Sequence, residues 1–360
     1  MNRRWICNDV WMDILPCFDH AQLGLKLALL SPRFNALVDK HFDGKSELTI
    51  WRSIEIRRKN SVTAAPEASV LINFDNSVPF PLPDRPLPSK IRFKRLQIDY
   101  IDHSVIAFLH ANQQIFDNGT NLQLFWISSP HTTDGQTLWN VFVREIWPIF
   151  TTNIRHLSFT GGDHLDNLFR LTSPTILTDL NQLNSIDSFD LLPAAIGDDF
   201  DGPNATAGQA LFKWLQTPRK DGQPKQLHCA LLNEQTYFDW VNNFKEHFLR
   251  ANAISSVSYE IHFTVLVPSM PMMPFELVNE WTKEKLTLAK AKKTENWIMK
   301  RCQIGEAATV QQQKKDENDN TVLFWLFSAT DSIGPLSPPP PTEEDKARKS
   351  ITKEPSSDIE

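Results

Sequence analysis

The chain has 360 residues, of which 41% are hydrophobic and 22% charged, and its formal net charge is −6. This length leaves room for two or three folded units, and the acidic balance argues against a general phosphate-binding surface, so we expect no nucleic-acid partner. The sequence has no apolar run of about eighteen residues, the length that suggests a membrane-spanning helix, and we expect no contact with membranes.

The N-terminus and the cysteines indicate an intracellular compartment. Asn8, Asp9 and Asp13 interrupt any apolar core that a secretion signal needs, so we expect the cytoplasm, with the nucleus as a further location. The four cysteines, which stand at no metal-ligand or redox spacing, are Cys7, Cys17, Cys229 and Cys302. Scattered thiols are typical of a reducing compartment, and the sequence predicts neither a metal site nor a cofactor.

Residues 6–42 carry three short helical patterns. The first follows a cap at Asn8 or Asp9, and Pro16 should shorten it because proline cannot donate the helical hydrogen bond. The second runs over 21–30, and the third begins with Ser31 as cap and Pro32 at the first helical position. The residues at helical spacing are Val10, Trp11, Ile14, Leu15 and Phe18, then Leu23, Leu27 and Leu30, then Phe34, Leu37, Val38 and Phe42.

A unit of forty residues cannot bury all of these apolar side chains by itself. The surplus either binds a partner or packs on the rest of the chain as a helical cap, and periodicity alone does not separate the two.

This unit resembles an F-box. The segment from Ile6 to Leu15 is similar to the opening of that motif, with Cys7 in place of the usual proline, and Leu23 and Leu27 match its middle leucines. The segment 30–38 is similar to its closing part, with Phe34 where tryptophan is common. The resemblance implies a three-helix unit that binds a Skp-type adaptor, and through it cullin, with the contact residues Ile6, Val10, Trp11, Ile14, Leu15, Phe18, Leu23, Leu27, Leu30, Phe34, Leu37 and Val38.

The next segment predicts a linker. A hydrophilic stretch precedes residues 78–88, where five prolines fall within ten positions and exclude a helix or a central strand. We therefore divide the chain into a helical unit at 1–45, a linker with this Pro-rich spacer at 46–89, an α/β repeat-like body at 90–270, a C-terminal β segment at 271–330 and a disordered Pro-rich tail at 331–360.

In the body, strand and helix patterns alternate, which predicts a mixed α/β fold. The expected strands are 94–98, 122–127, 154–159, 185–191, 226–232 and 257–267, and the expected helices are 104–116, 137–150, 163–171, 207–215 and 235–250. Successive strands start about 30 residues apart, as in an irregular leucine-rich-repeat array, although the consensus leucine spacing is absent. A non-repetitive α/β body is the alternative.

The C-terminal β segment predicts strands at 275–280, 285–289 and 296–302, with a further strand at 321–327. The phrase from Glu295 to Ile304, which follows a Leu-Thr-Leu strand, is similar to segments of the large F-box families of nematodes. The stretch 283–301 holds seven basic and two acidic residues, and we expect its lysines to be solvated on the hairpin surface.

No nucleophile elbow, phosphate loop or metalloprotease motif occurs, so we do not expect an enzyme. The resemblance implies a substrate-recognition adaptor of a Skp–cullin–F-box ubiquitin ligase that holds an unknown protein substrate on its body. The alternatives are an adaptor-binding protein outside a ligase, or an enzyme with an unrecognised site. The tryptophans of the body and C-terminal segment include Trp139, Trp147, Trp214, Trp240, Trp281 and Trp297, and of these we expect one or two to be partly exposed as partner anchors.

Overall fold

The computed structural model describes residues 6–18, 23–43, 49–58, 68–72, 80–83, 86–87, 91–116, 120–128, 135–159, 162–173, 175–195, 205–231, 234–252, 257–266, 272–291 and 296–304. The chain divides into two units, Met1–Gly305 and Glu306–Glu360, and every described residue belongs to the first. The expected strand at 321–327 and the expected disordered tail at 331–360 lie outside the described residues.

The N-terminal residues form five short helical elements. They are α1 (Asn8–Ile14), η1 (Leu15–Cys17), η2 (Leu23–Leu27), α3 (Ala28–Leu30) and α4 (Pro32–Asp43). Pro16 shortens the first helix as expected, because α1 ends at Ile14 and the 3₁₀ helix η1, which contains the proline, follows it. At the start of α4, the Ser31 hydroxyl accepts a hydrogen bond from the Phe34 N–H at 3.3 Å, as a capping residue does.

The cap expected at Asn8 or Asp9 is wrong. The N-cap of α1 is Cys7, whose side chain makes no capping bond. Asn8 has another role, since its Oδ1 accepts hydrogen bonds from Nε and Nη2 of Arg33 at 3.0 and 2.8 Å. Arg33 also donates to the Ile6 carbonyl at 2.6 Å, and it thereby ties the first residues of α4 to the chain ahead of α1.

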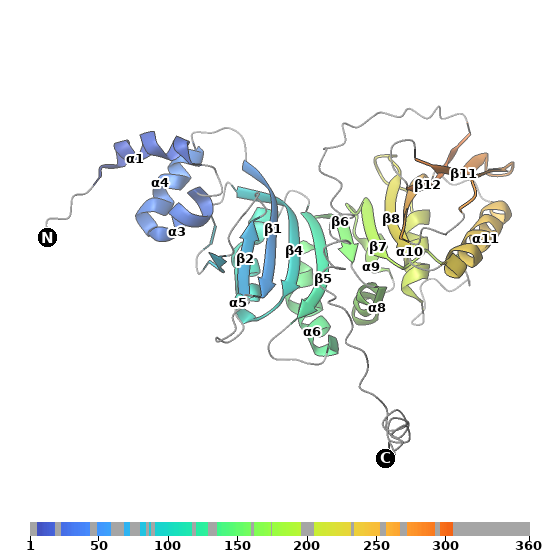
Figure 1. Ribbon diagram of the computed structural model, residues 1–360, viewed down its shortest axis with the longest axis horizontal. Coiled ribbons are helices and arrows are strands. Elements are labelled where there is room, and N and C mark those ends of the chain that lie inside the picture. The colour runs from blue at the N-terminus through green and yellow to red at the C-terminus, as the bar shows by residue number, and fades with distance from the viewer. Residues whose placement is uncertain are drawn as a thin grey trace, which may run out of the picture. The chain divides into compact units, whose positions relative to one another are not determined.

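One mixed sheet of twelve strands forms the rest of the described structure (Figure 1). Its order is β10-β11-β12-β9-β8-β7-β6-β5-β4-β1-β2-β3. The seven central strands are parallel: β1 (Thr49–Arg58), β4 (Ile91–Tyr100), β5 (Thr120–Ser128), β6 (Ile154–Phe159), β7 (Ser185–Phe189), β8 (Lys225–Leu231) and β9 (Tyr259–Val265). The strands at both ends are antiparallel: β2 (Ala68–Ile72) and β3 (Phe80–Pro81), and β10 (Phe275–Asn279), β11 (Glu284–Lys290) and β12 (Trp297–Gln303).

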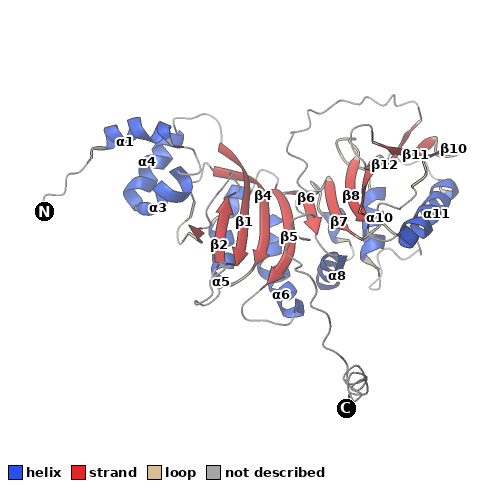
Figure 2. Cartoon of the chain, viewed as in Figure 1, coloured by secondary structure: helices blue, strands red, loops and turns tan. Residues whose placement is uncertain are grey.

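Helices connect the parallel strands in chain order. They are α5 (His103–Ala111), η3 (Gln113–Phe116), α6 (Gly135–Val141), η4 (Phe142–Ile146), α7 (Trp147–Phe150), α8 (Gly162–Leu171), α9 (Ile176–Asp179), α10 (Ala207–Gln216) and α11 (Glu234–Arg250). From β4 onward each parallel strand is added beside the previous one, so right-handed crossovers put these helices on one face of the sheet. Figure 2 shows α5 and α6 behind the strands of their half of the sheet.

The two faces of the sheet differ in chemistry. The face toward the helices is apolar, and its central row is Leu96, Leu122, Leu157, Ile186, Leu227, Ile261 and Met299, all buried. One residue further along each strand, a row of polar side chains crosses the opposite face. We call it the polar row: Glu55, Gln97, Gln123, Ser158, Asp187, His228 and His262.

Most elements lie where the sequence predicts them, but the linker does not begin at residue 46. Thr49–Arg58 is strand β1, with Ile54 and Ile56 fully buried, and it pairs in parallel with β4. This strand also holds Glu55 and three arginines, and these charges made the segment appear hydrophilic. The Pro-rich spacer is also ordered in its described part, because Leu87 is buried and its N–H donates to Asn112 Oδ1 at 2.7 Å.

Candidate interaction surfaces

The helical unit carries an exposed apolar surface. Four of the twelve residues expected to bind the adaptor are exposed: Leu30 (68%), Ile6 (47%), Val10 (45%) and Phe18 (37%). Exposed apolar side chains in so small a unit make this surface the first candidate for a partner contact.

The other eight expected contact residues lie deeper. Four are half-buried, namely Trp11, Ile14, Leu27 and Phe34, and four are buried, namely Leu15, Leu23, Leu37 and Val38. The Trp11 and Phe34 rings meet edge to face with their centroids 4.8 Å apart, which joins α1 to α4. The buried members form the core of the unit, and only the exposed and half-buried ones can touch another molecule.

The second candidate is centred on Asp187 of the polar row, whose carboxylate lies between His228 of the row and His156 of β6. His156 Nε2 lies 3.1 Å from Asp187 Oδ2, and His228 Nδ1 lies 2.8 Å from Asp187 Oδ1. Burial would raise the pKa of Asp187, but His156 and then His228 outweigh it and hold the pKa well below its usual range. Asp187 is therefore ionised at neutral pH and fixes both imidazoles on the sheet.

This arrangement continues along the neighbouring strands. The His228 and His262 rings lie with their centroids 4.8 Å apart, and His262 Nε2 is 3.5 Å from Glu260 Oε2. Lys300 Nζ lies 2.8 Å from Glu260 Oε1. The contact with His262, followed by that with Lys300, lowers the pKa of Glu260 to about 2 against the effect of burial. The result is a chain of contacts among histidine, carboxylate and lysine side chains across five strands, β6 to β9 and β12.

At the other end of the polar row, two carboxyl groups share one amide. Gln97 Nε2 lies 2.6 Å from Glu55 Oε1 and 3.1 Å from Asp99 Oδ1. Arg57 pairs with Glu55, and its Nε lies 3.6 Å from Asp99 Oδ2. Burial, and then the charge of Glu55, raises the pKa of Asp99 to about 7.

Most of the polar row is buried, and only His228 and His262 are partly exposed. Among the described residues, no group of three or more histidine, cysteine or acidic side chains is placed to hold a metal ion. Cys229 lies on the apolar face, and burial raises the pKa of its thiol to about 12, so it is a poor nucleophile at neutral pH. Of this cluster, His156, His228 and His262 are partly exposed and are the groups that can meet polar atoms of another chain.

Sequence reasoning did not identify the polar row, although a signal for it exists. In each strand from β4 to β9 a buried apolar residue is followed at once by a row member, as in Leu227-His228 and Ile261-His262. Aligning the expected strands on these dipeptides would have placed the row members side by side. The members come from strands about 30 to 40 residues apart, so no local motif reveals them.

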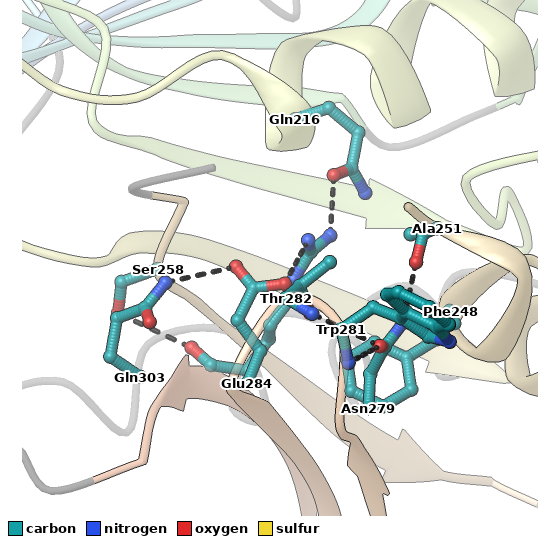
Figure 3. Close-up of polar contacts among 10 residues, drawn as sticks. Gln216, Phe248, Ala251, Ser258, Asn279, Trp281, Thr282, Glu284 and Gln303 are labelled. Carbon is teal, nitrogen blue, oxygen red and sulfur yellow. Dashed lines mark hydrogen bonds and ion pairs between the residues drawn. The ribbon is translucent and has the colours of Figure 1, made fainter. Parts of the chain in front are cut away.

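The third candidate is a turn that presents a tryptophan. The exposure expected for the tryptophans is confirmed, since Trp139, Trp147, Trp214 and Trp240 are buried and Trp297 is half-buried, while Trp281 is 79% exposed. Their role as partner anchors stays a prediction. Trp281 lies between β10 and β11, in a turn that Asn279 organises (Figure 3). Asn279 Nδ2 donates to the carbonyls of Phe248 (2.7 Å) and Ala251 (2.8 Å), and its Oδ1 accepts from the N–H groups of Trp281 and Thr282.

A buried ion pair supports the same hairpin. Arg301 Nη2 lies 2.6 Å from Glu284 Oε2, and Arg301 Nη1 donates to Gln216 Oε1 at 2.6 Å (Figure 3). Most of the basic residues in 283–301 that the structure describes face carboxylates in this way, since Lys283, Lys285 and Lys300 pair with Glu280, Glu276 and Glu260. Lys283 and Lys290 are exposed as expected, whereas Lys285 and Lys300 are half-buried beside their carboxylates.

No helix within the described parts of the chain combines the length and the apolar character that crossing a bilayer requires. Comparison with known proteins finds no match to any protein-family model, curated protein or solved structure.

Proposed function

We propose that this protein is a substrate-recognition adaptor of a Skp–cullin–F-box ubiquitin ligase. The observation that carries the proposal is the exposed apolar surface of the helical unit, whose most exposed members are Leu30, Ile6 and Val10. These exposed residues lie in the segments that resemble an F-box, so the sequence resemblance and the exposed apolar side chains indicate the same residues.

The size of this surface fits a stable contact. A fully buried large apolar side chain contributes roughly 1.5–3 kcal/mol, so covering four exposed and four half-buried ones supplies gross burial energy that can exceed the cost of association. The buried residues Leu15, Leu23, Leu37 and Val38 maintain the helical unit, which leaves the outer residues for the Skp-type adaptor.

The body is proposed to hold the protein substrate. From β4 to β9 each strand–helix unit follows the previous one in chain order, which supports an irregular leucine-rich-repeat-like array, because such arrays add units in one direction. The face opposite the helices is then the recognition surface, and His156, His228 and His262 are its partly exposed polar groups. The chemical step occurs on a ubiquitin-charged enzyme elsewhere in the ligase, and this chain raises the effective concentration of substrate lysines there.

The test is adaptor binding by exposed-residue variants. Leu30→Asp and Val10→Asp each place a charge where a partner would bury it, so we expect at least a tenfold weaker affinity for a purified Skp-type adaptor in calorimetry. Leu249→Asp, which changes an apolar residue on α11 that is 49% exposed, is the matched control and should bind normally. A charge at the buried Leu37 would unfold the unit and is uninformative, and one at the half-buried Leu27 risks the same.

The binding experiment also separates the alternatives. Unchanged affinity in folded Leu30→Asp and Val10→Asp variants would refute the proposed surface. If the adaptor binds but a pull-down from cells brings down no cullin, the chain is an adaptor-binding protein outside a ligase.

A further inference from the structure

The two edges of the sheet are built differently. One edge is β3, which has two residues, one of them Pro81, and proline and short length both protect an edge from further pairing. The other edge is β10, a strand of five residues without proline. Its single charged residue, Glu276, is already paired with Lys285 of β11 at 2.9 Å. In the described part of the chain, β10 has β11 on one side and no strand on the other.

The direction of the backbone groups in β10 follows from two hydrogen bonds of the hairpin. Ile304 N–H donates to the Lys283 carbonyl at 2.8 Å, and Ala291 N–H donates to the Asn296 carbonyl at 2.9 Å. Odd-numbered residues of β11 therefore bond to β12, and even-numbered ones bond to β10, because antiparallel ladders alternate. Glu284, Leu286 and Leu288 pair with Asn279, Leu277 and Phe275. The backbone groups of Glu276 and Val278 consequently point away from the sheet.

Apolar side chains surround this open edge. Trp281 follows the strand, Met273 precedes it, and Val278 lies within it, with exposures of 79%, 72% and 38%. The Asn279 turn fixes the backbone of Trp281, because Asn279 Oδ1 accepts a hydrogen bond from its N–H. A natural edge strand that is not meant to pair would carry charge or proline at such positions.

We propose that β10 pairs with β10 of a second copy of this chain, antiparallel, with Leu277 at the two-fold axis. In this register Glu276 stands opposite Val278 of the other copy, and the outward backbone groups of both residues make four hydrogen bonds across the axis. In this register Met273, which precedes β10, lies at the same end of the paired strands as the Trp281 turn of the other copy, because each is four residues from Leu277. The two most exposed large apolar side chains of the described structure are thus brought to the same end of the interface, twice, and methionine and tryptophan attract each other.

Neighbouring registers are worse. An axis at Glu276 places two carboxylates directly opposite each other and pairs Val278 with Pro274, which has no N–H to donate. An axis at Val278 brings Trp281 opposite Phe275 and leaves Met273 without a counterpart in the strand. An axis between two residues would pair a residue whose backbone groups point outward with one whose backbone groups point into its own sheet. The axis at Leu277 is therefore the register that satisfies both the backbone and the side chains.

The interface is small, which sets the conditions of the test. Contacts that bury less than about 1,200 Å² are usually weak or transient, so dimers should form over about 5–500 μM. The mass of the full chain, measured by sedimentation over this range, should rise from one copy toward two. Val278→Pro removes only an outward N–H and should keep the fold but abolish the rise, and Trp281→Ser should weaken association at least about thirtyfold. The control Leu249→Ser should associate like the parent chain.

A cysteine scan tests the register itself. In a chain with the exposed Cys7 and Cys17 replaced by serine, Leu277→Cys should form a covalent dimer on mild oxidation, because non-hydrogen-bonded partners have Cα atoms about 4.5 Å apart. Val278→Cys should not, since the two copies of residue 278 are diagonal neighbours more than about 7 Å apart. A folded chain that stays a monomer at the highest concentration overturns the proposal, and so does a dimer that Val278→Pro leaves intact.

Discussion

Replacing Asp99 by asparagine should stabilise this protein at neutral and alkaline pH. The pKa of Asp99 rises from 3.8 to about 7 because the carboxyl is buried and faces Glu55. A rise of about three units corresponds to about 4 kcal/mol at about 1.36 kcal/mol per unit. The side chain is 24% exposed and Arg57 offsets part of the repulsion, so we expect about 1–3 kcal/mol of unfolding free energy.

The pH dependence gives this prediction its signature. Below about pH 4 Asp99 is protonated in both the folded and the unfolded chain and contributes nothing to the difference. Between about pH 4 and 7 the folded chain holds a proton that the unfolded chain has lost, so the wild-type chain loses stability as the pH rises. Urea unfolding at about pH 4.5, 6 and 7.5 should therefore show a gain for Asp99→Asn that grows with pH. A variant that is equally destabilised at all three values would show that Asp99 is an ionised partner of Arg57.

Two further substitutions test the other clusters. Asp187→Asn should lower the free energy of unfolding by about 2–4 kcal/mol at pH 7, because it leaves His156 and His228 without their carboxylate, and the loss should shrink as the pH falls below about 4; an equal loss at pH 2 and 7 would contradict the charge argument. Asn279→Ala should cost about 2–4 kcal/mol in urea unfolding, since it orphans the buried Phe248 carbonyl and frees the Trp281 turn, and an unchanged midpoint would refute that role.

The alternation of strands and helices could be predicted because each element is patterned locally. Strand β6 and helix α8 were expected within a residue of their bounds, since their apolar residues recur at the spacing of a strand and a helix. Strand β1 was not predicted because Glu55 and Arg57, which lie on the polar face of the sheet, alternate with the buried Ile54 and Ile56. The charged residues make the apolar pattern hard to recognise.

The candidate surfaces were harder to predict, because they depend on which strands become neighbours. The likeness of the helical unit to a known motif named its residues, but only the structure separates the exposed Leu30 from the buried Leu37. The pairing of Asp187 with His156 and His228 needs the register of three strands, which composition and periodicity do not contain. The exposure of Trp281 likewise follows from the hydrogen bonds of Asn279 and not from the tryptophan itself.

The chain-order arrangement of the parallel strands has a consequence during synthesis. Strands β5 to β9 leave the ribosome in chain order, and each can pair with a strand that has already been synthesised. The sheet therefore grows at one edge, through contacts between segments that are close in the sequence. That edge is closed only when the hairpin β10–β11 and then β12 arrive, because β12 covers β9. A nascent chain stalled before residue 297 would leave β9, with Tyr259, Ile261 and Phe263, as an open strand that invites aggregation.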